Sequence, residues 1–238
     1  MTDDADPLAW ETRASDVAYA CPGFEVVHQD VRLPDGTDTD FDYLTEPEAV
    51  VVLPFAANAS DGDDASTEDG DLGALDAGEV VVIEEWRQAV SRVNRGLPAG
   101  SIEPDDDDLA VAARRELREE TGYEAGDVSH LCTVEPANGL LDSVHHVYVA
   151  TGCEPAGEQE LDFNESIRVD TTGFSDLLAA VRDGRIRDGR THVAVTRYAL
   201  ERALGDAHDA TGGAEPAAGE AADVVDANAP ATQGGDGA

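Results

Sequence analysis

Residues 97–123 read LPAGSIEPDDDDLAVAARRELREETGY, and this stretch decides the fold. Its second half, residues 108–121, begins in a run of aspartates that can cap a helix N-terminus. It stops at Gly122, the residue type that most often ends a helix. The stretch therefore predicts one helix with clear signals at both ends.

Three glutamates crowd one face of this helix. Glu116 and Glu120 are four residues apart, about 40° around the helix axis, and Glu119 lies alongside. Like charges at this spacing destabilise a bare helix by a few tenths of a kcal/mol. A hard divalent cation such as Mg²⁺ would remove that repulsion, and Arg115 is placed to hold Glu119 as an ion pair. The alternative is a solvated acidic face in a chain with 52 acidic residues.

The segment resembles the Nudix box, G-x5-E-x7-R-E-U-x-E-E-x-G-U, in which U is aliphatic or aromatic. Residues 115–123, RELREETGY, match it position by position. Counting back from the arginine places the acidic position on Asp107 and the glycine on Ser101. Gly100 then matches only if one residue is inserted in the loop 101–106. The resemblance implies an α+β protein, an α/β/α sandwich around a mixed β-sheet with an N-terminal antiparallel β region.

The resemblance also implies roles for residues of the box. The implied metal ligands are the carbonyl of Ala99 and the carboxylates of Glu116, Glu119 and Glu120. The ion would be Mg²⁺, with Mn²⁺ as the alternative. Glu119 and Glu120 would take part in catalysis, whereas Arg115 and Gly122 would be structural.

The resemblance extends over roughly residues 10–200 and is to the ADP-ribose pyrophosphatases within the Nudix hydrolases. The matching segments are residues 10–12, 23–27, 31–36, 50–54, 85–87 and 97–100. Residues 135–139, EPANG, lie where that subfamily has a proline-containing loop associated with ADP-ribose specificity, which implicates Pro136. Glu165 lies in a segment that resembles the acidic loop supplying a catalytic base, although a loop glutamate is more often only solvated.

Further substrate contacts are expected around the box. Gly100 would lie against the diphosphate, and the guanidinium groups of Arg87 and Arg95 match phosphate oxygens in shape and charge. Both arginines are equally well explained as partners of nearby carboxylates. Gly96 departs from the pattern, since many relatives have a glutamate there.

The implied reaction is hydrolysis of ADP-ribose to AMP and ribose 5-phosphate. Two alternatives remain: a Nudix hydrolase of another nucleotide sugar, a dinucleotide or an oxidised nucleotide, or a non-catalytic nucleotide-sensing module. The N-terminal strands of the subfamily commonly exchange between subunits, which implies a homodimer. Trp10, Phe24 and Trp86 are candidates for stacking on adenine, the alternative being that each belongs to the core.

The charge of the chain restricts its partners. The 238 residues carry 52 acidic groups against 15 basic ones, a formal charge of -37, and every basic residue is arginine. Such a field repels phosphate backbones and anionic bilayers, so no nucleic-acid or membrane partner is expected. A lysine-free acidic surface suits concentrated salt, where screening is strong, and this predicts a halophilic protein. The alternative is an acidic mesophilic protein.

The composition also predicts how the chain is divided. Residues 1–56 are expected to form the N-terminal β region used in dimerisation, and residues 80–204 the Nudix domain. Residues 57–79 and 205–238 hold 8 and 7 acids and no base, which predicts an acidic flexible loop and a disordered acidic tail. Three distant cysteines and an N-terminus without a secretory signal predict a cytoplasmic protein.

Overall fold

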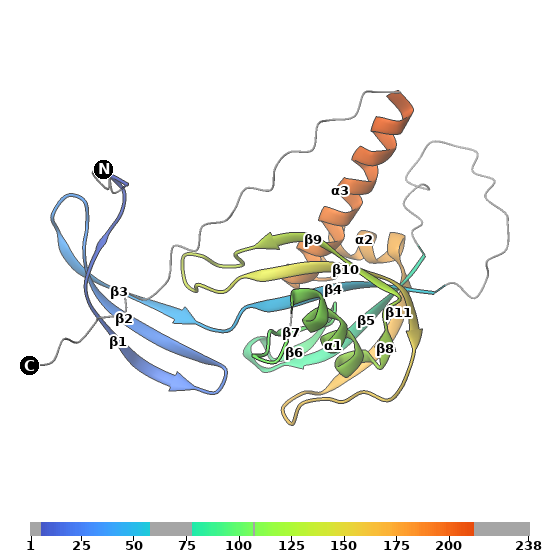
Figure 1. The fold of residues 1–238 in the computed structure, drawn as a ribbon, viewed down its shortest axis with the longest axis horizontal. Coiled ribbons are helices and arrows are strands. Elements are labelled where there is room, and N and C mark those ends of the chain that lie inside the picture. The colour runs from blue at the N-terminus through green and yellow to red at the C-terminus, as the bar shows by residue number, and fades with distance from the viewer. Residues whose placement is uncertain (1–5, 58–77, 107, 212–238) are drawn as a thin grey trace, which may run out of the picture.

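The computed structural model describes residues 6–57, 78–106 and 108–211, which form two β-sheets and three α-helices (Figure 1). The smaller sheet contains β1 (Glu11–Cys21), β2 (Phe24–Arg32) and β3 (Asp38–Thr45), antiparallel and in that order. The hairpin between β2 and β3 turns at Pro34-Asp35-Gly36, residue types that favour a tight turn. The strand β1 was not predicted, because its residues are almost all exposed and show no clear apolar alternation.

The larger sheet has eight strands. Its main path runs β11-β5-β4-β10-β8, with β6 beside β5, β7 beside β4 and β9 beside β10. Their bounds are β4 (Ala49–Ala56), β5 (Glu79–Arg87), β6 (Arg92–Gly96), β7 (Ala99–Ser101), β8 (Tyr123–Glu124), β9 (Asp127–Val134), β10 (His145–Pro155) and β11 (Ile167–Gly173). Strands β4 and β10 are parallel, whereas the other pairs are antiparallel, so the sheet is mixed as expected.

Helices cover both faces of the large sheet and complete an α/β/α sandwich (Figure 1). Side chains alternate along β4: Val51 and Leu53 join the core under α2 (Phe174–Arg182) and α3 (Gly189–Thr211). Val50 and Val52 instead join the core under α1 (Leu109–Thr121). A strand buried on both faces reads as a continuous apolar run, which explains the sequence of β4. The fold class predicted from the sequence is confirmed.

Two boundaries differ from the predicted division of the chain. The small sheet ends at Thr45, and β4 belongs to the large sheet, so the N-terminal β region is shorter than residues 1–56. The helix α3 continues to Thr211, past the predicted start of the tail at residue 205. Residues 58–77 and 212–238, which contain most of both acidic segments, lie outside the described residues. No described helix is long and apolar enough to cross a membrane.

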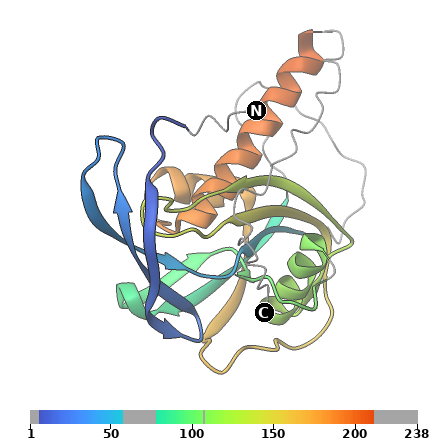
Figure 2. The ribbon, with the colours of Figure 1, turned by 60° about the vertical axis from the view of Figure 1, so that its left-hand side comes forward.

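The small sheet stands beside the large one rather than lying over its face (Figures 1 and 2). The two are joined where the chain passes from β3 into β4 and by the loop before β10. The N–H of Leu44 donates to the carbonyl of Leu140, and the N–H of Asp142 donates to the carbonyl of Leu44. This loop therefore connects the end of β3 to the large sheet.

Replacing Gly122 by Ala should destabilise the fold by more than about 2 kcal/mol. Gly122 ends α1 with a φ of 73°, where L-residues are strained by about 1–2 kcal/mol. A Cβ there would also collide with the carbonyl oxygen of Gly157, a backbone atom. Gly184 is a matched control, because its φ is 72° and a Cβ would meet nothing within 4 Å. Urea denaturation should show a clearly smaller loss for Gly184→Ala, and equal losses would contradict the collision.

Candidate active site

The helix α1 carries its glutamates toward the loop that precedes it in the chain. Asp108 caps the helix by accepting hydrogen bonds from the N–H groups of Ala110 and Val111, at 2.8 and 2.9 Å. Glu116 and Glu120 are buried, with 8% and 3% of their surface exposed. The alternative of a solvated acidic face is therefore wrong for these two side chains.

Burial of two carboxylates has an electrostatic cost. Loss of hydration raises the pKa of Glu116 to about 7 and that of Glu120 to about 8, and their mutual repulsion adds to the shift of Glu120. The N–H of Ala99 donates to Oε2 of Glu120 at 2.9 Å, which partly opposes the shift. Two ionisable carboxylates that are shielded from water offer oxygen ligands of the kind that a hard cation binds.

The strand β7 brings the backbone of Ala99 and Gly100 against α1. It pairs with β4, with Val51 opposite Ala99 and Val50 opposite Gly100. A Cβ on Gly100 would overlap the carboxylate of Glu116, so the glycine leaves room for this carboxylate in its observed position. The structure thus places Ala99, Gly100 and the two buried glutamates in one site.

Arg115 organises the outer side of this site. Its Nη1 donates to Glu116 at 2.7 Å and to Glu119 at 2.9 Å, and its Nη2 donates to the carbonyl of Ser101 at 2.9 Å. Its Nε and Nη2 hold both oxygens of Asp106, at 3.1 and 2.9 Å. Arg115 therefore fixes the carboxylates in place, and the ion pair predicted with Glu119 is confirmed.

The contacts of Arg115 bear on the register of the box. The sequence placed the acidic position on Asp107, with the extra residue in the loop 101–106, and residue 107 is outside the described residues. Among the described residues, Arg115 holds the carboxylate of Asp106, whose side chain is 4% exposed. Gly100 and Asp106 keep the box spacing of five intervening residues. Asp106 therefore also fits the acidic position, with the extra residue between Asp106 and the arginine.

Two further acids act electrostatically on the buried pair. Glu165, in the loop before β11, is half-buried, and its charge contributes to the raised pKa of both Glu116 and Glu120. Glu85, on β5, is 7% exposed, and burial raises its pKa as well. The charge of Glu85 also raises the pKa of Glu120. Glu165 was predicted at this site, whereas Glu85 was not.

The predicted phosphate-binding residues fall into two different places. Arg87 and Pro136 line one cavity of about 620 Å³. Arg95 lines a smaller cavity of about 160 Å³ beside α2 and pairs with Asp170 at 3.0 Å. Arg87 is also paired, with Glu85 at 2.7 Å. The ion-pair alternative is thus confirmed for both arginines, and only Arg87 shares a cavity with the predicted specificity loop.

The departure at Gly96 has a local explanation. A Cβ there would lie 2.9 Å from Oγ1 of Thr191 and 3.3 Å from Oδ2 of Asp188. Asp188 accepts hydrogen bonds from the N–H and Oγ1 of Thr191, at 2.9 and 2.7 Å, and so caps α3. Burial raises the pKa of Asp188, but Arg190 and these hydrogen bonds outweigh it, so the pKa is lowered overall. The space for a longer side chain at residue 96 is taken by this cap.

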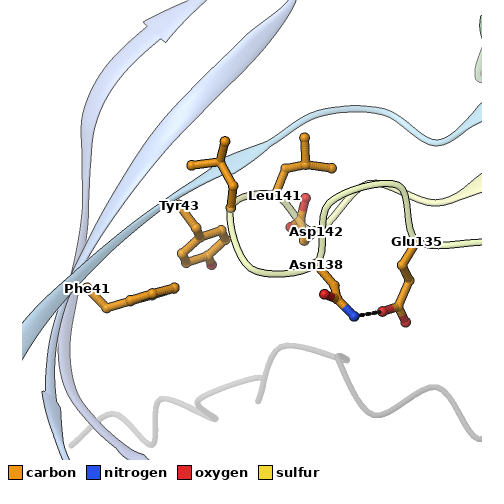
Figure 3. Close-up of a pocket in the computed structure, with 7 residues that line it drawn as sticks. Phe41, Tyr43, Glu135, Asn138, Leu141 and Asp142 are labelled. Atoms are coloured by element: carbon orange, nitrogen blue, oxygen red, sulfur yellow. Dashed lines mark hydrogen bonds between the residues drawn. The ribbon is translucent and has the colours of Figure 1, made fainter. Parts of the chain in front are cut away.

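A separate pocket of about 330 Å³ lies between the small sheet and the loop before β10. Phe41 and Tyr43 of β3 form one wall, and Asn138 and Asp142 of the loop form another (Figure 3). Asn138 donates to Glu135 at 2.9 Å across the base of the loop (Figure 3).

The aromatic candidates for stacking on adenine are all accessible. Trp10, Phe24 and Trp86 are 50%, 38% and 48% exposed, so the alternative that they belong to the core is wrong.

The sequence did not predict the residues that come from distant parts of the chain to line the cavity of Arg87. Arg190, Asp188 and His145 all line the cavity of Arg87. One available signal was the segment 182–190, RDGRIRDGR, which holds 4 of the 15 arginines of a lysine-free chain. No such signal indicated Glu85, because a glutamate near the end of a strand is common and does not by itself predict a site.

Similarity to known proteins agrees with this architecture. The NUDIX domain family model matches residues 69–189. The chain is 26% identical over 198 residues to the ADP-ribose pyrophosphatase of Bacillus subtilis (strain 168), covering 83% of this chain and 96% of that protein. It is 30% identical over 173 residues to the ADP-ribose pyrophosphatase of Mycobacterium tuberculosis (strain ATCC 25618 / H37Rv), covering 73% of each.

Other relatives have different names. The chain is 28% identical over 176 residues to the methanol dehydrogenase activator of Bacillus methanolicus, covering 74% of this chain and 84% of that protein. The crystal structure of an ADP compounds hydrolase superposes with a TM-score of 0.64 at 18% identity, covering 85% of this chain and 96% of that one, and it supports the fold.

An α/β/α sandwich with buried glutamates on its box helix is the arrangement of a hydrolase of this class. The chain belongs to the Nudix family, and it is a Nudix hydrolase whose relatives include ADP-ribose pyrophosphatases.

Proposed function

We propose that the protein hydrolyses the diphosphate bond of ADP-ribose, giving AMP and ribose 5-phosphate, with Mg²⁺ or Mn²⁺ bound. The observation that carries this proposal is the site in which Glu116 and Glu120 are buried against the Ala99–Gly100 backbone. Nudix hydrolases generally use divalent ions, and this donor set of hard oxygens suits one. The similarity to ADP-ribose pyrophosphatases over most of the chain favours the substrate.

Each residue of the site has a task in this proposal. Glu116, Glu119, Glu120 and the carbonyl of Ala99 would hold the ion, which when bound neutralises the diphosphate and lowers the pKa of a bound water. Arg115 keeps Glu116 and Glu119 oriented before substrate arrives. Glu165 is proposed to accept the proton of the attacking water, since its charge acts on both buried glutamates.

A substrate screen tests the proposal. Phosphate release by an added phosphatase should follow hydrolysis of ADP-ribose in the presence of Mg²⁺ and stop when the ion is chelated. Sugar nucleotides and dinucleotides should be hydrolysed more slowly. Faster hydrolysis of one of these would reassign the substrate, and no activity on any of them would favour the sensing module.

The effect of Mg²⁺ on stability should depend on pH. A glutamate in an unfolded chain titrates near a pKa of ~4.3, whereas the pKa values of Glu116 and Glu120 are raised to about 7 and about 8. The folded state binds the protons of Glu116 and Glu120 more tightly than the unfolded state does. Their protonation therefore stabilises the fold fully below a pH of ~4.3, and this stabilisation is lost as the pH rises through the folded pKa values. Bound Mg²⁺ needs the ionised carboxylates, so it should raise the melting temperature more at pH 8.5 than at pH 5.5.

Scanning calorimetry at the two pH values, with the ion and with a chelator, measures this difference. Glu124 is exposed and lies beyond the end of α1. The variant Glu124→Gln is therefore a control that should leave the pH dependence unchanged. An equal increase at both pH values would show that the buried glutamates do not bind the ion.

Other expectations about the chain remain proposals. A homodimer through the small sheet is supported by exposed apolar side chains on it, including Val17 and Tyr19 at 54% and 56%. Adaptation to concentrated salt is supported by the charge of -37 without lysine. Light scattering tests the first, and stability in dilute against multimolar potassium chloride tests the second. The cytoplasmic location stays a prediction.

A further inference from the structure

The loop between β10 and β11 is attached to the end of the box helix α1. The last carbonyl groups of a helix have no partner within the helix and need donors from elsewhere. Here the N–H of Glu160 donates to the carbonyl of Glu119 at 2.8 Å, and the side-chain Nε2 of Gln159 donates to the carbonyl of Glu120 at 2.6 Å. The loop therefore satisfies the main-chain oxygens of two residues whose side chains belong to the glutamate site.

The first residues of the loop strengthen this attachment. The N–H groups of Ala156 and Gly157 both donate to the carbonyl of Gly122, at 2.8 and 3.1 Å. Arg118 of α1 also lies 3.3 Å from the carboxylate of Glu160, but both side chains are exposed, so this ion pair contributes little. Residues 156–160 are thus held against the end of the helix chiefly by hydrogen bonds to its carbonyl groups.

Side-chain packing does little to fix this loop. None of residues 156–166, all of which the structure describes, is buried, and Gln159, Leu161 and Glu165 are half-buried. A cavity of about 840 Å³ lies beside the loop, and its lining includes Gln159, Leu161 and Val169 of β11. Because little side-chain surface is buried, hydrogen bonds determine where the loop stands. Gln159 supplies a side-chain bond, which a substitution can remove without changing the main chain.

The same loop carries Glu165. The N–H of Glu165 donates to the carbonyl of Asp162 at 3.0 Å, and the N–H of Asp162 donates to Oε2 of Glu165 at 3.0 Å. These reciprocal bonds make residues 162–165 a compact turn that holds the Glu165 carboxylate. Asp162 follows Gln159 by three residues, and three residue steps span at most about 11 Å. An anchor at Gln159 therefore restricts where this turn and its carboxylate can stand.

We propose that Gln159 is a positioning residue for the reaction at the glutamate site. Its amide fixes the loop against α1 and thereby keeps Glu165 in place relative to Glu116 and Glu120, on both of which the charge of Glu165 acts. The inference rests on the function proposed above, in which Glu165 accepts the proton of the attacking water. Gln159 acts through Glu165, because its own bond is to the main-chain oxygen of Glu120.

Replacing Gln159 by Met, which has a similar length but no donor, tests this role. The variant should lower kcat by at least about 10-fold and change KM by less than about 2-fold, because the base is displaced while the substrate contacts remain. Gln29→Met is the matched control, since Gln29 is also half-buried and its amide donates to Oγ of Ser15 on the small sheet, at 3.4 Å. It should leave both constants unchanged. Wild-type kcat in Gln159→Met would overturn the proposal.

A double-mutant cycle with Glu165→Gln separates the positioning of the base from a general weakening of the fold. If Gln159 acts through Glu165, then Gln159→Met should lower kcat by less than about 2-fold once the carboxylate is already absent. Losses that multiply in the double variant would show that the two residues act independently, and they would overturn the proposal.

Amide hydrogen exchange gives a readout that needs no hydrolysis. In Gln159→Met, the hydrogen-bonded amides of Glu160, Asp162 and Glu165 should exchange at least about 10-fold faster than in the wild-type protein, whereas those of β4 should be unchanged. Unchanged exchange in the loop would overturn the proposal, because the loop would then not depend on this anchor. Absence of hydrolysis by the wild-type protein would instead contradict the proposed function, and the exchange would still show whether Gln159 anchors the loop.

Discussion

Replacing Glu120 by Gln should lower kcat by at least about 10³-fold, a loss of about 4 kcal/mol of transition-state stabilisation. The amide has the size of the carboxylate but no charge with which to bind the ion. Its carbonyl oxygen can still accept the hydrogen bond from the N–H of Ala99. Since burial raises the pKa of Glu120 to about 8, the neutral side chain is the form that the metal-free fold prefers at pH 7.

The variant Glu120→Gln should therefore lose activity without losing stability. Its melting temperature without Mg²⁺ should equal or exceed that of the wild-type protein, and Mg²⁺ should no longer raise it. Glu124→Gln makes the same chemical change at an exposed position paired with Arg118, and it should leave both properties unchanged. Wild-type turnover in Glu120→Gln would eliminate the proposed site.

Replacing Gly100 by Ala should lower kcat/KM by about 10²-fold, the size of loss that a displacement of about 1 Å at a catalytic group can cause. The new methyl group would occupy the place of the Glu116 carboxylate. The end of a glutamate side chain can move, so the fold should adapt. The carboxylate would then leave its position 2.7 Å from Arg115, and the ion site would be distorted.

Titration of activity with Mg²⁺ should show that Gly100→Ala needs a higher concentration of the ion than the wild-type enzyme. Gly23→Ala is the control, because a Cβ at Gly23 meets nothing within 4 Å and its φ is not positive. Urea denaturation should show losses below about 1 kcal/mol for both variants. Unchanged activity in Gly100→Ala would mean that the position of Glu116 is not needed for catalysis.

The sequence identified the box helix and its glutamates because their information is local. The capping aspartate, the glycine at residue 122 and the four-residue spacing of Glu116 and Glu120 all lie within one short segment. It left the register before the helix open, because a loop can absorb one residue anywhere along its length. The contact between Asp106 and Arg115 favours an extra residue between these two residues.

The cavity of about 620 Å³ that Arg87 lines illustrates the opposite case. Arg92 and Arg187 are far apart in the sequence, and neither belongs to a motif. They line one cavity because β6 pairs with β5 and because the segment before α3 lies beside these strands. Likewise, the predicted pair of phosphate contacts, Arg87 and Arg95, separates into two cavities. The pairing of strands decides which side chains of distant segments line the same cavity, and a single sequence does not give that pairing.

The sequence alone therefore determined the family resemblance, the α+β class, the box helix with its three glutamates and the acidic, lysine-free composition. The tertiary structure alone decided which glutamates are buried, that Gly100 must make room for Glu116, and which arginines share a cavity. The physical reason is the range of the interactions. Helix capping and helical spacing act over a few residues, whereas burial and charge pairing depend on groups that the chain brings together only when the sheet has formed.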